Sequence, residues 1–205
     1  HSKAKGVYTL AIVNVIGSSV AREADDVLYT WAGPEIAVAS TKAYSVQCSL
    51  LYLFALRLAM IKGKMTEEEV SKICRDMLAN IPSAIEKTLA YSDKIREIAK
   101  QYLNTEHLFY IGRGIDCDLC TEGSLKLKEL SYIHSEAYAS GELKHGTISL
   151  ITEGTPVIAV MSVSSVCEKT ISGIREVKSR GAKVFAVITE ELDSKFDIPC
   201  DEKIV

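Results

Sequence analysis

The sequence predicts an open α/β fold with parallel sheets, present as two tandem copies of which the first is incomplete. Apolar runs of strand length alternate with amphipathic segments of helical length, the pattern of a parallel sheet flanked by helices. The strand-length runs are almost continuously apolar, as in strands that are buried on both faces. A strand pattern that follows Gly6 recurs after Gly181, which indicates an internal repeat.

The composition is typical of a globular protein with a hydrophobic core. The chain has 205 residues, of which 47% are hydrophobic and 25% charged, enough for one large or two small domains. Its net charge of -3 does not favour nucleic acid or acidic membranes, so neither is expected as a partner. The longest apolar-rich run, residues 46–61, contains Gln47, Ser49 and Arg57 and is expected to be too short and too polar to span a bilayer. No secretory signal precedes the first strand, and a cytoplasmic location is expected.

The cysteines are scattered rather than arranged as a disulfide framework, which is typical of reduced thiols. They are Cys48, Cys74, Cys117, Cys120, Cys167 and Cys200. Cys117 and Cys120 form a Cys-x-x-Cys on a predicted helix, but no second pair and no flanking histidine supports zinc. Packing is therefore favoured over redox or metal chemistry, and no metal or cofactor is expected.

The first copy begins with strands predicted at residues 8–15 and 27–31, joined by a short helix that Ser19 caps. A long helix is predicted at residues 38–62, with Gly63 as its C-terminal stop.

Residues 65–98 are interpreted as a helical connector. Thr66, followed by three glutamates, opens a helix with a capping residue and acids in its first turn. Pro82 is expected to break that helix, and residues 83–103 are predicted to form a second, charged helix.

The second copy begins with a strand at residues 107–112 and a helix at 116–133. A loop rich in titratable groups and a short helical turn at 145–151 follow. The remaining elements are predicted as strand, helix, strand and strand, at residues 156–162, 166–180, 182–189 and from about Lys203. The expected domains are therefore the C-terminal part of a first copy (1–64), the connector (65–98) and the second copy (99–205).

The repeat predicts what each copy lacks. Residues 6–13 resemble residues 181–188, and residues 24–28 resemble residues 200–204. The first copy has no counterpart of residues 107–180, and the second lacks the long helix that should follow its last strand. We therefore expect the chain to be a fragment of a longer tandem protein.

Three charged residues lie at helical spacing on the helix predicted at 116–133. Glu122, Lys126 and Glu129 fall within about 60° of one another, beside an apolar stripe. Lys126 between two carboxylates is favoured in its charged form. The arrangement suits proton transfer, and a solvated ladder of ion pairs explains the spacing equally well.

A second titratable group is the loop at 142–146, Glu-Leu-Lys-His-Gly. His145 in such a loop is suited to acid–base work near neutral pH, although a surface histidine without function has the same pattern. His134, at the end of the predicted helix, is expected to interact with the helix dipole, and His107 is assigned no function. The Gly-Arg-Gly turn at 112–114 precedes a helix N-terminus that favours anions.

The stretch at 34–42, Pro-Glu-Ile-Ala-Val-Ala-Ser-Thr-Lys, places small residues and hydroxyls at the start of the long predicted helix. Backbone N–H groups at a helix start are free to meet a ligand. A plain N-terminal cap is the alternative, and the pattern alone does not choose between them.

These motifs resemble those of one known family. The turn at 112–114, the helix segment 122–129 and the segments 132–136 and 141–146 resemble the isomerase half of the glutamine–fructose-6-phosphate aminotransferase (glucosamine-6-phosphate synthase) family. Residues 33–43 resemble that family's first sugar-isomerase (SIS) domain. The resemblance covers essentially the whole chain, and it implies two tandem SIS domains with flavodoxin-like, three-layer folds.

The resemblance implies an enzyme that converts fructose 6-phosphate and glutamine-derived ammonia into glucosamine 6-phosphate. By motif position, Glu129 looks like the acid–base residue that moves a proton between C1 and C2, and Lys126 would assist at the sugar hydroxyls. His145 would promote ring opening at the neighbouring subunit's site, which implies a homodimer, and Arg113 would orient the acidic cluster. The residues implied to border the sugar are Val38, Ala39 and Ser40.

The chain departs from the family pattern in several places. Thr147 stands where the family usually has proline. The family's Ser-Gln-Ser phosphate loop, its C-terminal tail with the Schiff-base lysine and its glutaminase domain are missing, and none of the six cysteines replaces the glutaminase nucleophile. The fragment alone is therefore expected to be inactive, and a glutaminase domain is expected in the parent chain.

Two alternative functions remain open. One is a related sugar-phosphate deglycase or isomerase of the same fold, and the other is a SIS module that senses sugar phosphates without chemistry. Retention of Glu129, Lys126 and His145 argues against the sensor, because binding phosphate does not require an acid–base set. The loop at 142–146 favours the synthase over the deglycase.

Overall fold

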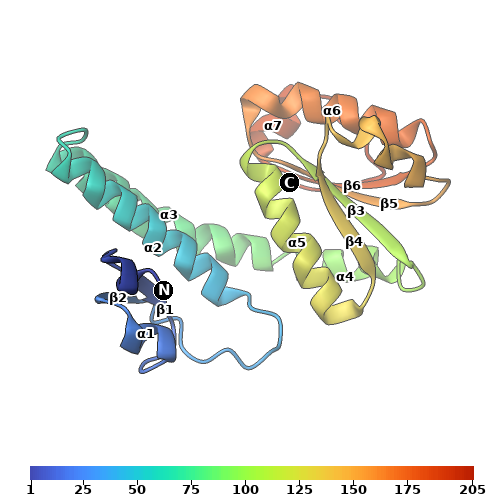
Figure 1. Ribbon diagram of the computed structural model, residues 1–205. Coiled ribbons are helices and arrows are strands. Elements are labelled where there is room, and N and C mark those ends of the chain that lie inside the picture. Colours follow the sequence, from blue (N-terminus) through green and yellow to red (C-terminus); the bar gives the residue numbers. More distant parts are fainter. The chain divides into compact units, whose positions relative to one another are not determined.

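The computed structural model describes all 205 residues and divides them into two compact units, His1–Lys87 and Thr88–Val205 (Figure 1). The first unit contains a two-stranded sheet and the second a five-stranded sheet, and every strand pair is parallel. The predicted α/β fold with parallel sheets and flanking helices is confirmed.

Apart from the short 3-10 helix η1, which was not predicted, the first unit follows the predicted element order. Its elements are η1 (Lys3–Lys5), β1 (Leu10–Val13), α1 (Ser19–Glu23), β2 (Asp26–Tyr29), α2 (Lys42–Ile61) and α3, which begins in this unit (Glu67–Leu89). Ser18, rather than Ser19, caps α1, because its hydroxyl accepts the N–H of Ala21 at 3.3 Å. The strands are shorter than predicted, and α2 starts later than predicted. Gly63, with φ of +63°, follows the end of α2 as expected.

The helix α3 begins as predicted but continues through Pro82. Thr66 and Glu69 form a reciprocal cap, in which the Glu69 N–H donates to the Thr66 hydroxyl at 3.2 Å and the Thr66 N–H donates to the Glu69 carboxylate at 2.7 Å. The predicted break at Pro82 is wrong, since α3 is continuous to Leu89. A proline removes one backbone hydrogen bond, and the remaining bonds of a long helix maintain its course.

The helix α2 has 20 residues and no buried side chain. By length and composition it could cross a membrane, so the expectation that this segment is too short and too polar is wrong on both counts. A core helix of a soluble protein meets the same criterion, and composition alone therefore does not distinguish the two.

The second unit is a doubly wound sheet with the strand order β4-β3-β5-β6-β7. Its elements are α4 (Ser92–Lys100), β3 (His107–Gly112), α5 (Ile115–Ser131), β4 (His134–Ala139), η2 (Leu143–His145), η3 (Thr147–Leu150), β5 (Pro156–Met161), α6 (Ser164–Lys178), β6 (Lys183–Ile188), α7 (Glu190–Lys195) and β7 (Glu202–Ile204). β3 has the predicted bounds, and β5, β6 and α6 differ from prediction by only a few residues. The single helix predicted at 83–103 is wrong, because α3 ends at Leu89 and α4 is separate.

In the second unit, two elements were not predicted, β4 and α7. The segment of β4, His-Ser-Glu-Ala-Tyr-Ala, lacks the apolar run of the other strands because β4 is an edge strand that pairs only with β3. His134 therefore begins a strand and does not end a helix, so the predicted interaction with the dipole of α5 is wrong.

The core of the second unit lies between the sheet and α6 with α7. The strands contribute alternate apolar side chains and α6 contributes one face, in agreement with the two periodicities. The fully covered side chains include Ile111, Val157, Ala159, Val184, Ala186, Ile174 and Val177, each 0% exposed. Leu192 joins the same core from α7, at 1% exposure.

Candidate functional site

The strand order of the second unit reverses between β3 and β5, and ligands of open α/β sheets bind outside the strand ends at such a reversal. The turn at 112–114 leaves β3 there. A Cβ on Gly112 would lie 2.7 Å from the carbonyl carbon and oxygen of Asp116, so only glycine allows α5 to start this close to the strand.

Asp116, at the start of α5, lies between the turn that follows β3 and the loop that follows β5. Its side chain is 2% exposed, and it accepts the N–H of Ser162 at 3.0 Å as well as the Ser162 hydroxyl. Asp118 lies in the same first turn of α5. Because two carboxylates already lie at this helix start, the structure opposes the prediction that it attracts anions.

Arg113 packs against the loop that carries the second titratable group. A Cβ on Gly141 would lie 2.3 Å from a terminal nitrogen of Arg113, so glycine is required for the guanidinium to lie there. No ion pair joins Arg113 to Glu122 or Glu129. The structure therefore brings Arg113 to the loop 141–146, and its predicted contact with the acidic cluster stays a prediction.

The acidic cluster is formed on one face of α5. The Lys126 ammonium lies 2.7 Å from a carboxylate oxygen of Glu129 and 3.5 Å from one of Glu122. The side chains of Glu122, Lys126 and Glu129 are 21%, 19% and 30% exposed, so the cluster is sheltered but still reached by solvent. The predicted grouping is thus present, with an intermediate burial that fits neither a fully solvated ladder nor a core ion pair.

The electrostatics of the cluster keep Lys126 charged. The hydrogen bond to Glu129 raises the pKa of Lys126, burial opposes this shift, and the charge of Glu122 raises the pKa further. An ammonium has three donors, and the two carboxylates account for two of them. The cluster therefore offers a cation with donor capacity beside a carboxylate that accepts protons.

His145 ends the short helix η2 and is exposed. Its backbone N–H donates to the Glu142 carbonyl at 3.0 Å, which closes the turn that presents the imidazole to solvent. Thr147, at the position where the family pattern has proline, donates its hydroxyl to the Leu143 carbonyl at 3.4 Å. Hydrogen bonds within the loop thus hold its shape, and His145 is exposed on it.

The polar row on β4 was not predicted as a site, although its first two residues lie in the segment 132–136 that carries the family resemblance. His134, Glu136 and Tyr138 alternate along the strand and share one face. The Tyr138 hydroxyl donates to Glu136, and this hydrogen bond, followed by burial, raises the pKa of Tyr138. His134 Nε2 lies 3.6 Å from the other Glu136 oxygen, and its Nδ1 lies 3.3 Å from Nδ1 of His107. The alternation of polar residues at 134, 136 and 138 is visible in the sequence. It indicates a shared face only if the segment is a strand, and no strand was predicted there.

In the first unit, the stretch before α2 has the geometry of an N-terminal cap. One oxygen of Glu35 accepts the Ala43 N–H at 2.9 Å and the Ser40 hydroxyl at 3.2 Å. The hydrogen bond from the Ala43 N–H is the largest cause of the lowered pKa of Glu35, and burial opposes the shift. The amide is therefore already paired, which favours the cap over a free ligand site.

The three residues implied to border a sugar lie just before this helix and differ in exposure. Val38 is 91% exposed, Ala39 is 1% exposed, and Ser40 is partly buried by its contact with Glu35. A role of Val38, Ala39 and Ser40 in substrate binding remains a prediction.

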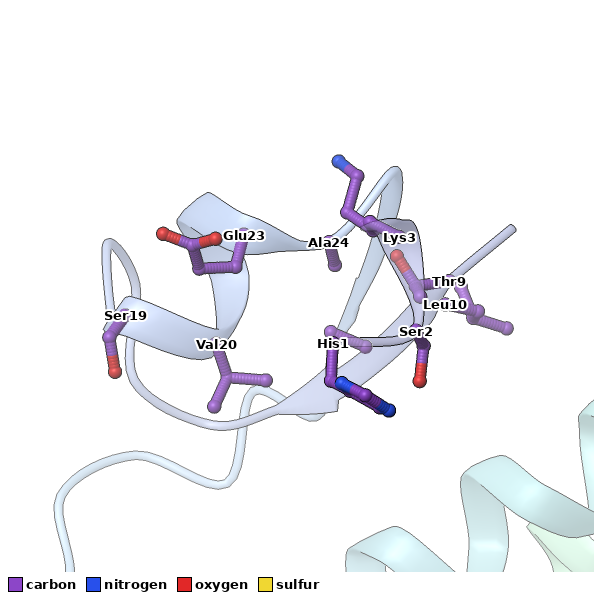
Figure 2. Close-up of a pocket in the computed structure, with 10 residues that line it drawn as sticks. His1, Ser2, Lys3, Thr9, Leu10, Ser19, Val20, Glu23 and Ala24 are labelled. Atoms are coloured by element: carbon purple, nitrogen blue, oxygen red, sulfur yellow. The ribbon is translucent and has the colours of Figure 1, made fainter. Parts of the chain in front are cut away.

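A cavity of about 370 Å³ in the first unit contains none of the predicted site residues. Figure 2 shows its lining side chains, which come from the N-terminal segment, β1 and α1. His1, Lys3 and Glu23 are its titratable members.

The cysteines behave as packing residues. None forms a disulfide, and burial raises the pKa of Cys120 to about 12 and also raises the pKa of Cys117. A raised pKa keeps a thiol protonated and unreactive. These values agree with the preference for packing over redox chemistry at the Cys-x-x-Cys.

Comparisons with known proteins agree with the resemblance inferred from the motifs. The glutamine–fructose-6-phosphate aminotransferase (isomerizing) of Clostridium acetobutylicum is 52% identical over 190 residues, which are 93% of this chain and 31% of that protein. That of Caldanaerobacter subterraneus is 53% identical over 91% of this chain and 30% of its own length. The chain thus spans about a third of the length of these relatives.

A solved structure gives the same result for the fold. The C-terminal domain of glucosamine-fructose-6-phosphate aminotransferase from Francisella tularensis matches with a TM-score of 0.92 and 36% identity, over 98% of this chain and 58% of that one. The sequence profile described as the SIS domain matches residues 1–57 and 101–204. Since this match covers most of the chain, the chain belongs to the SIS domain family.

Proposed function

We propose that the chain is part of the isomerase region of a glutamine–fructose-6-phosphate aminotransferase, which makes glucosamine 6-phosphate from fructose 6-phosphate and glutamine. The observation that carries the proposal is the sheltered Glu122–Lys126–Glu129 cluster, with the ammonium 2.7 Å from Glu129. Relatives with this name are 52% and 53% identical over most of the chain.

Glu129 is proposed to move the proton of the isomerisation. In the ketimine of the open sugar, a carboxylate takes a carbon-bound proton from C1 and returns it to C2, while the proton of the C1 hydroxyl passes to the imine nitrogen; this leaves the amine on C2 and an aldehyde on C1. Carboxylates perform such transfers without a metal when substrate and base are held together.

Lys126 is proposed to hold the sugar hydroxyls beside this carboxylate. The ammonium is already paired with Glu129 and Glu122, and its remaining donor is available to a hydroxyl. The same side chain would therefore orient substrate and base together.

His145, in the loop 141–146, and Arg113, which lies against that loop, are proposed to take part in the same reaction. The exposed imidazole of His145 is proposed to promote ring opening in the site of a partner subunit, which requires a homodimer. Arg113, which lies against Gly141, is proposed to position that loop and the acidic cluster. Val38, Ala39 and Ser40 are proposed to border the sugar.

The remaining features of the parent protein belong to the same proposal. We infer domains at residues 1–64 and 99–205 with a connector at 65–98, and the SIS profile leaves residues 58–100 unmatched in support of this division. The parent is proposed to carry a glutaminase domain, since the chain covers only 31% of a named relative. The free cysteines support a reducing, cytoplasmic location.

The experiment uses the longer natural polypeptide with glutamine and fructose 6-phosphate. Glu129→Gln should lower kcat by a factor of about 10²–10⁴ with unchanged thermal stability, because the amide cannot take up the proton. Glu168→Gln, an exposed change on α6, is the matched control and should retain activity. Retained turnover in Glu129→Gln contradicts the role of this residue.

Two further measurements separate the alternatives. Formation of glucosamine 6-phosphate by the wild-type protein distinguishes the synthase from a deglycase, and absence of any turnover would indicate a sensor. The 205-residue chain alone should show negligible isomerase activity and weak affinity for sugar phosphates. A micromolar dissociation constant for the chain alone would show that it binds without further segments.

A further inference from the structure

Two histidines that the proposed reaction does not use meet at the start of two adjacent strands. His107 begins β3 and His134 begins β4, which lie side by side (Figure 1). The two residues are paired directly opposite each other in the parallel register, although they are 27 residues apart in the chain. Both side chains are exposed. Because the strands fix both backbones, the imidazoles are held as a pair rather than as separate surface groups.

The pair lies on the face of the sheet opposite α5. Ser135 points toward α5, since its hydroxyl donates to the Ser124 carbonyl at 2.9 Å. Successive side chains of a strand point to opposite faces, so His134 and Glu136 point away from α5. The acid–base cluster lies on α5 and is therefore separated from the histidine pair by the sheet.

The two rings have the geometry of a metal chelate. The Nδ1 atoms of His107 and His134 are 3.3 Å apart and the ring centroids 5.3 Å, so each Nδ1 lies on the side of its ring that faces the other. Two nitrogen ligands of a tetrahedral Zn²⁺, each about 2.0–2.1 Å from the metal, are about 3.3–3.4 Å apart. Hydrogen bonds from N–H to oxygen are typically shorter, at about 2.7–3.2 Å. The separation thus matches two ligands of one metal ion.

A carboxylate orients the pair from further along β4. One oxygen of Glu136 lies 3.6 Å from Nε2 of His134, and the Tyr138 hydroxyl donates to the other oxygen. A carboxylate beside Nε2 favours the tautomer with its N–H at that nitrogen, which leaves the lone pair of Nδ1 free for a metal. Histidines that bind metals commonly have a partner of this kind.

The chemistry of the ligands selects the class of metal. Imidazole nitrogen suits Zn²⁺, Cu²⁺ and Ni²⁺, whereas Mg²⁺ prefers oxygen. No group of three or more histidine, cysteine and acidic side chains converges at the pair. Two imidazoles therefore fill two positions of a tetrahedral ion, and water fills the others.

We propose that His107 and His134 bind one divalent transition-metal ion, Zn²⁺ by the tetrahedral separation of the ligands, and that this ion links the start of β4 to β3. The strand β4 is an edge strand that pairs only with β3. A metal that bridges the two strands is held only when they are paired, so it stabilises the edge of the sheet. The proposal is independent of the proposed function, and its tests measure neither sugar binding nor turnover.

Isothermal titration calorimetry with ZnCl₂ alone, in the longer natural polypeptide at about pH 7.5, tests the site, because imidazole binds metal in its neutral form. His107→Asn and His134→Asn should each weaken the binding of one equivalent of Zn²⁺ by a factor of about 10 or more, since a chelate needs both ligands. Thiols also bind Zn²⁺, so wild type and variants are compared by difference.

The matched control is His145→Asn, which removes an exposed histidine outside the pair and should bind Zn²⁺ as the wild type does. MgCl₂ should give the same result with the wild type and both variants of the pair. Unchanged Zn²⁺ binding in either His107→Asn or His134→Asn overturns the proposal. Glu136→Gln should weaken the affinity about 10-fold, and an unchanged affinity overturns the orienting role of Glu136.

Hydrogen exchange measured by mass spectrometry locates the ion. The His134 N–H donates to the Glu106 carbonyl at 3.1 Å, where the pairing of β3 and β4 begins. At a Zn²⁺ concentration of ten times the dissociation constant, exchange at the start of β4 should slow about tenfold, because the strand must release the ion to open. The same concentration should leave exchange in His107→Asn unchanged. Equal protection in wild type and His107→Asn, or no protection at β4, overturns the proposal.

Discussion

The strand pair β1–β2 of the first unit and the pair β6–β7 of the second share one local design. In each, an aspartate carboxylate accepts the N–H of a residue on the preceding strand segment, Thr9 for Asp25 at 2.8 Å and Val184 for Asp201 at 2.7 Å. In each, a lysine pairs with that aspartate at 2.8 Å, Lys3 in the first unit and Lys178 in the second. The repeated residues thus form the same hydrogen bonds twice.

The two pairs differ in what surrounds them. β6 lies inside a five-stranded sheet and buries Val184, Ala186 and Ile188 at 0–5% exposure, whereas β1 has only β2 beside it and, of the three counterparts, Ala11 alone is buried while Thr9 and Val13 are partly exposed. Local sequence therefore specifies the hydrogen bond of the aspartate, its ion pair with the lysine and the register of each strand pair. Burial, which provides most of the stability, depends on neighbours from distant parts of the chain.

The largest difference is expected from a core truncation at equivalent positions. Ile188→Ala should cost about 2–5 kcal/mol, because Ile188 is 5% exposed and its removal leaves a cavity. Val13→Ala, the repeat counterpart on β1, should cost below about 1 kcal/mol because Val13 is only partly buried. Native-state hydrogen exchange of the two strands measures both costs separately. Equal costs would contradict the view that neighbours set the stability.

The glycines that precede the strands should also separate the two units. Gly181 has φ of +89°, and an added Cβ would lie 2.1 Å from a carboxylate oxygen of Glu153 and 2.8 Å from its Cα. Gly6 has φ of +73° with nothing within 4 Å. Gly181→Ala should therefore cost about 2–4 kcal/mol through strain and overlap, and Gly6→Ala about 1 kcal/mol through strain alone. Denaturant unfolding of both variants checks this, and a larger cost at Gly6 would refute it.

A smaller difference is expected for the aspartates. Asp201→Ala should cost about 1–3 kcal/mol, since it leaves the buried N–H of Val184 without its acceptor. Asp25→Ala should cost less, because Thr9 is only partly buried and water can replace the acceptor of its N–H, whereas Val184 is fully buried. Hydrogen exchange at Val184 and Thr9 reports each loss, with Asp201→Asn and Asp25→Asn as the conservative controls. A cost at Asp25 equal to that at Asp201 would count against the comparison.

The lowered pKa values of these two aspartates predict how each unit responds to acid. Burial works to raise the pKa of Asp201, but hydrogen bonds from Lys178 and Val184 hold it below the usual value. The pKa of Asp25 is lowered to about 2, first by Lys3 and then by Thr9. A lowered pKa stabilises the fold above the unfolded value of about 4 and loses this contribution as the pH falls through the folded value. Titration by NMR from pH 5 downward should show Asp25 retaining its charge to about pH 2, and a midpoint near 4 would contradict this.

Much of the second unit was predictable because its elements have strong local signals. The strand at 107–112 has the predicted bounds, since a continuous apolar run between polar residues leaves little choice of register. The grouping of Glu122, Lys126 and Glu129 also followed from helical spacing alone. The polar row of β4 could not be predicted in this way, because an edge strand with alternating polar residues resembles a loop until β3 is placed beside it.

The sequence by itself determined most of the element order, the repeat, the grouping of Glu122, Lys126 and Glu129 and the family resemblance, because each depends on residues that are close along the chain. Only the tertiary structure decided that α3 continues through Pro82, that Glu35 caps the start of α2 and that Asp116 fills the reversal point between β3 and β5. It also brought His107 and His134, which are 27 residues apart in the chain, together at the start of β3 and β4. These features depend on which groups meet in space, and burial and pairing are properties of the assembled layers rather than of any one segment.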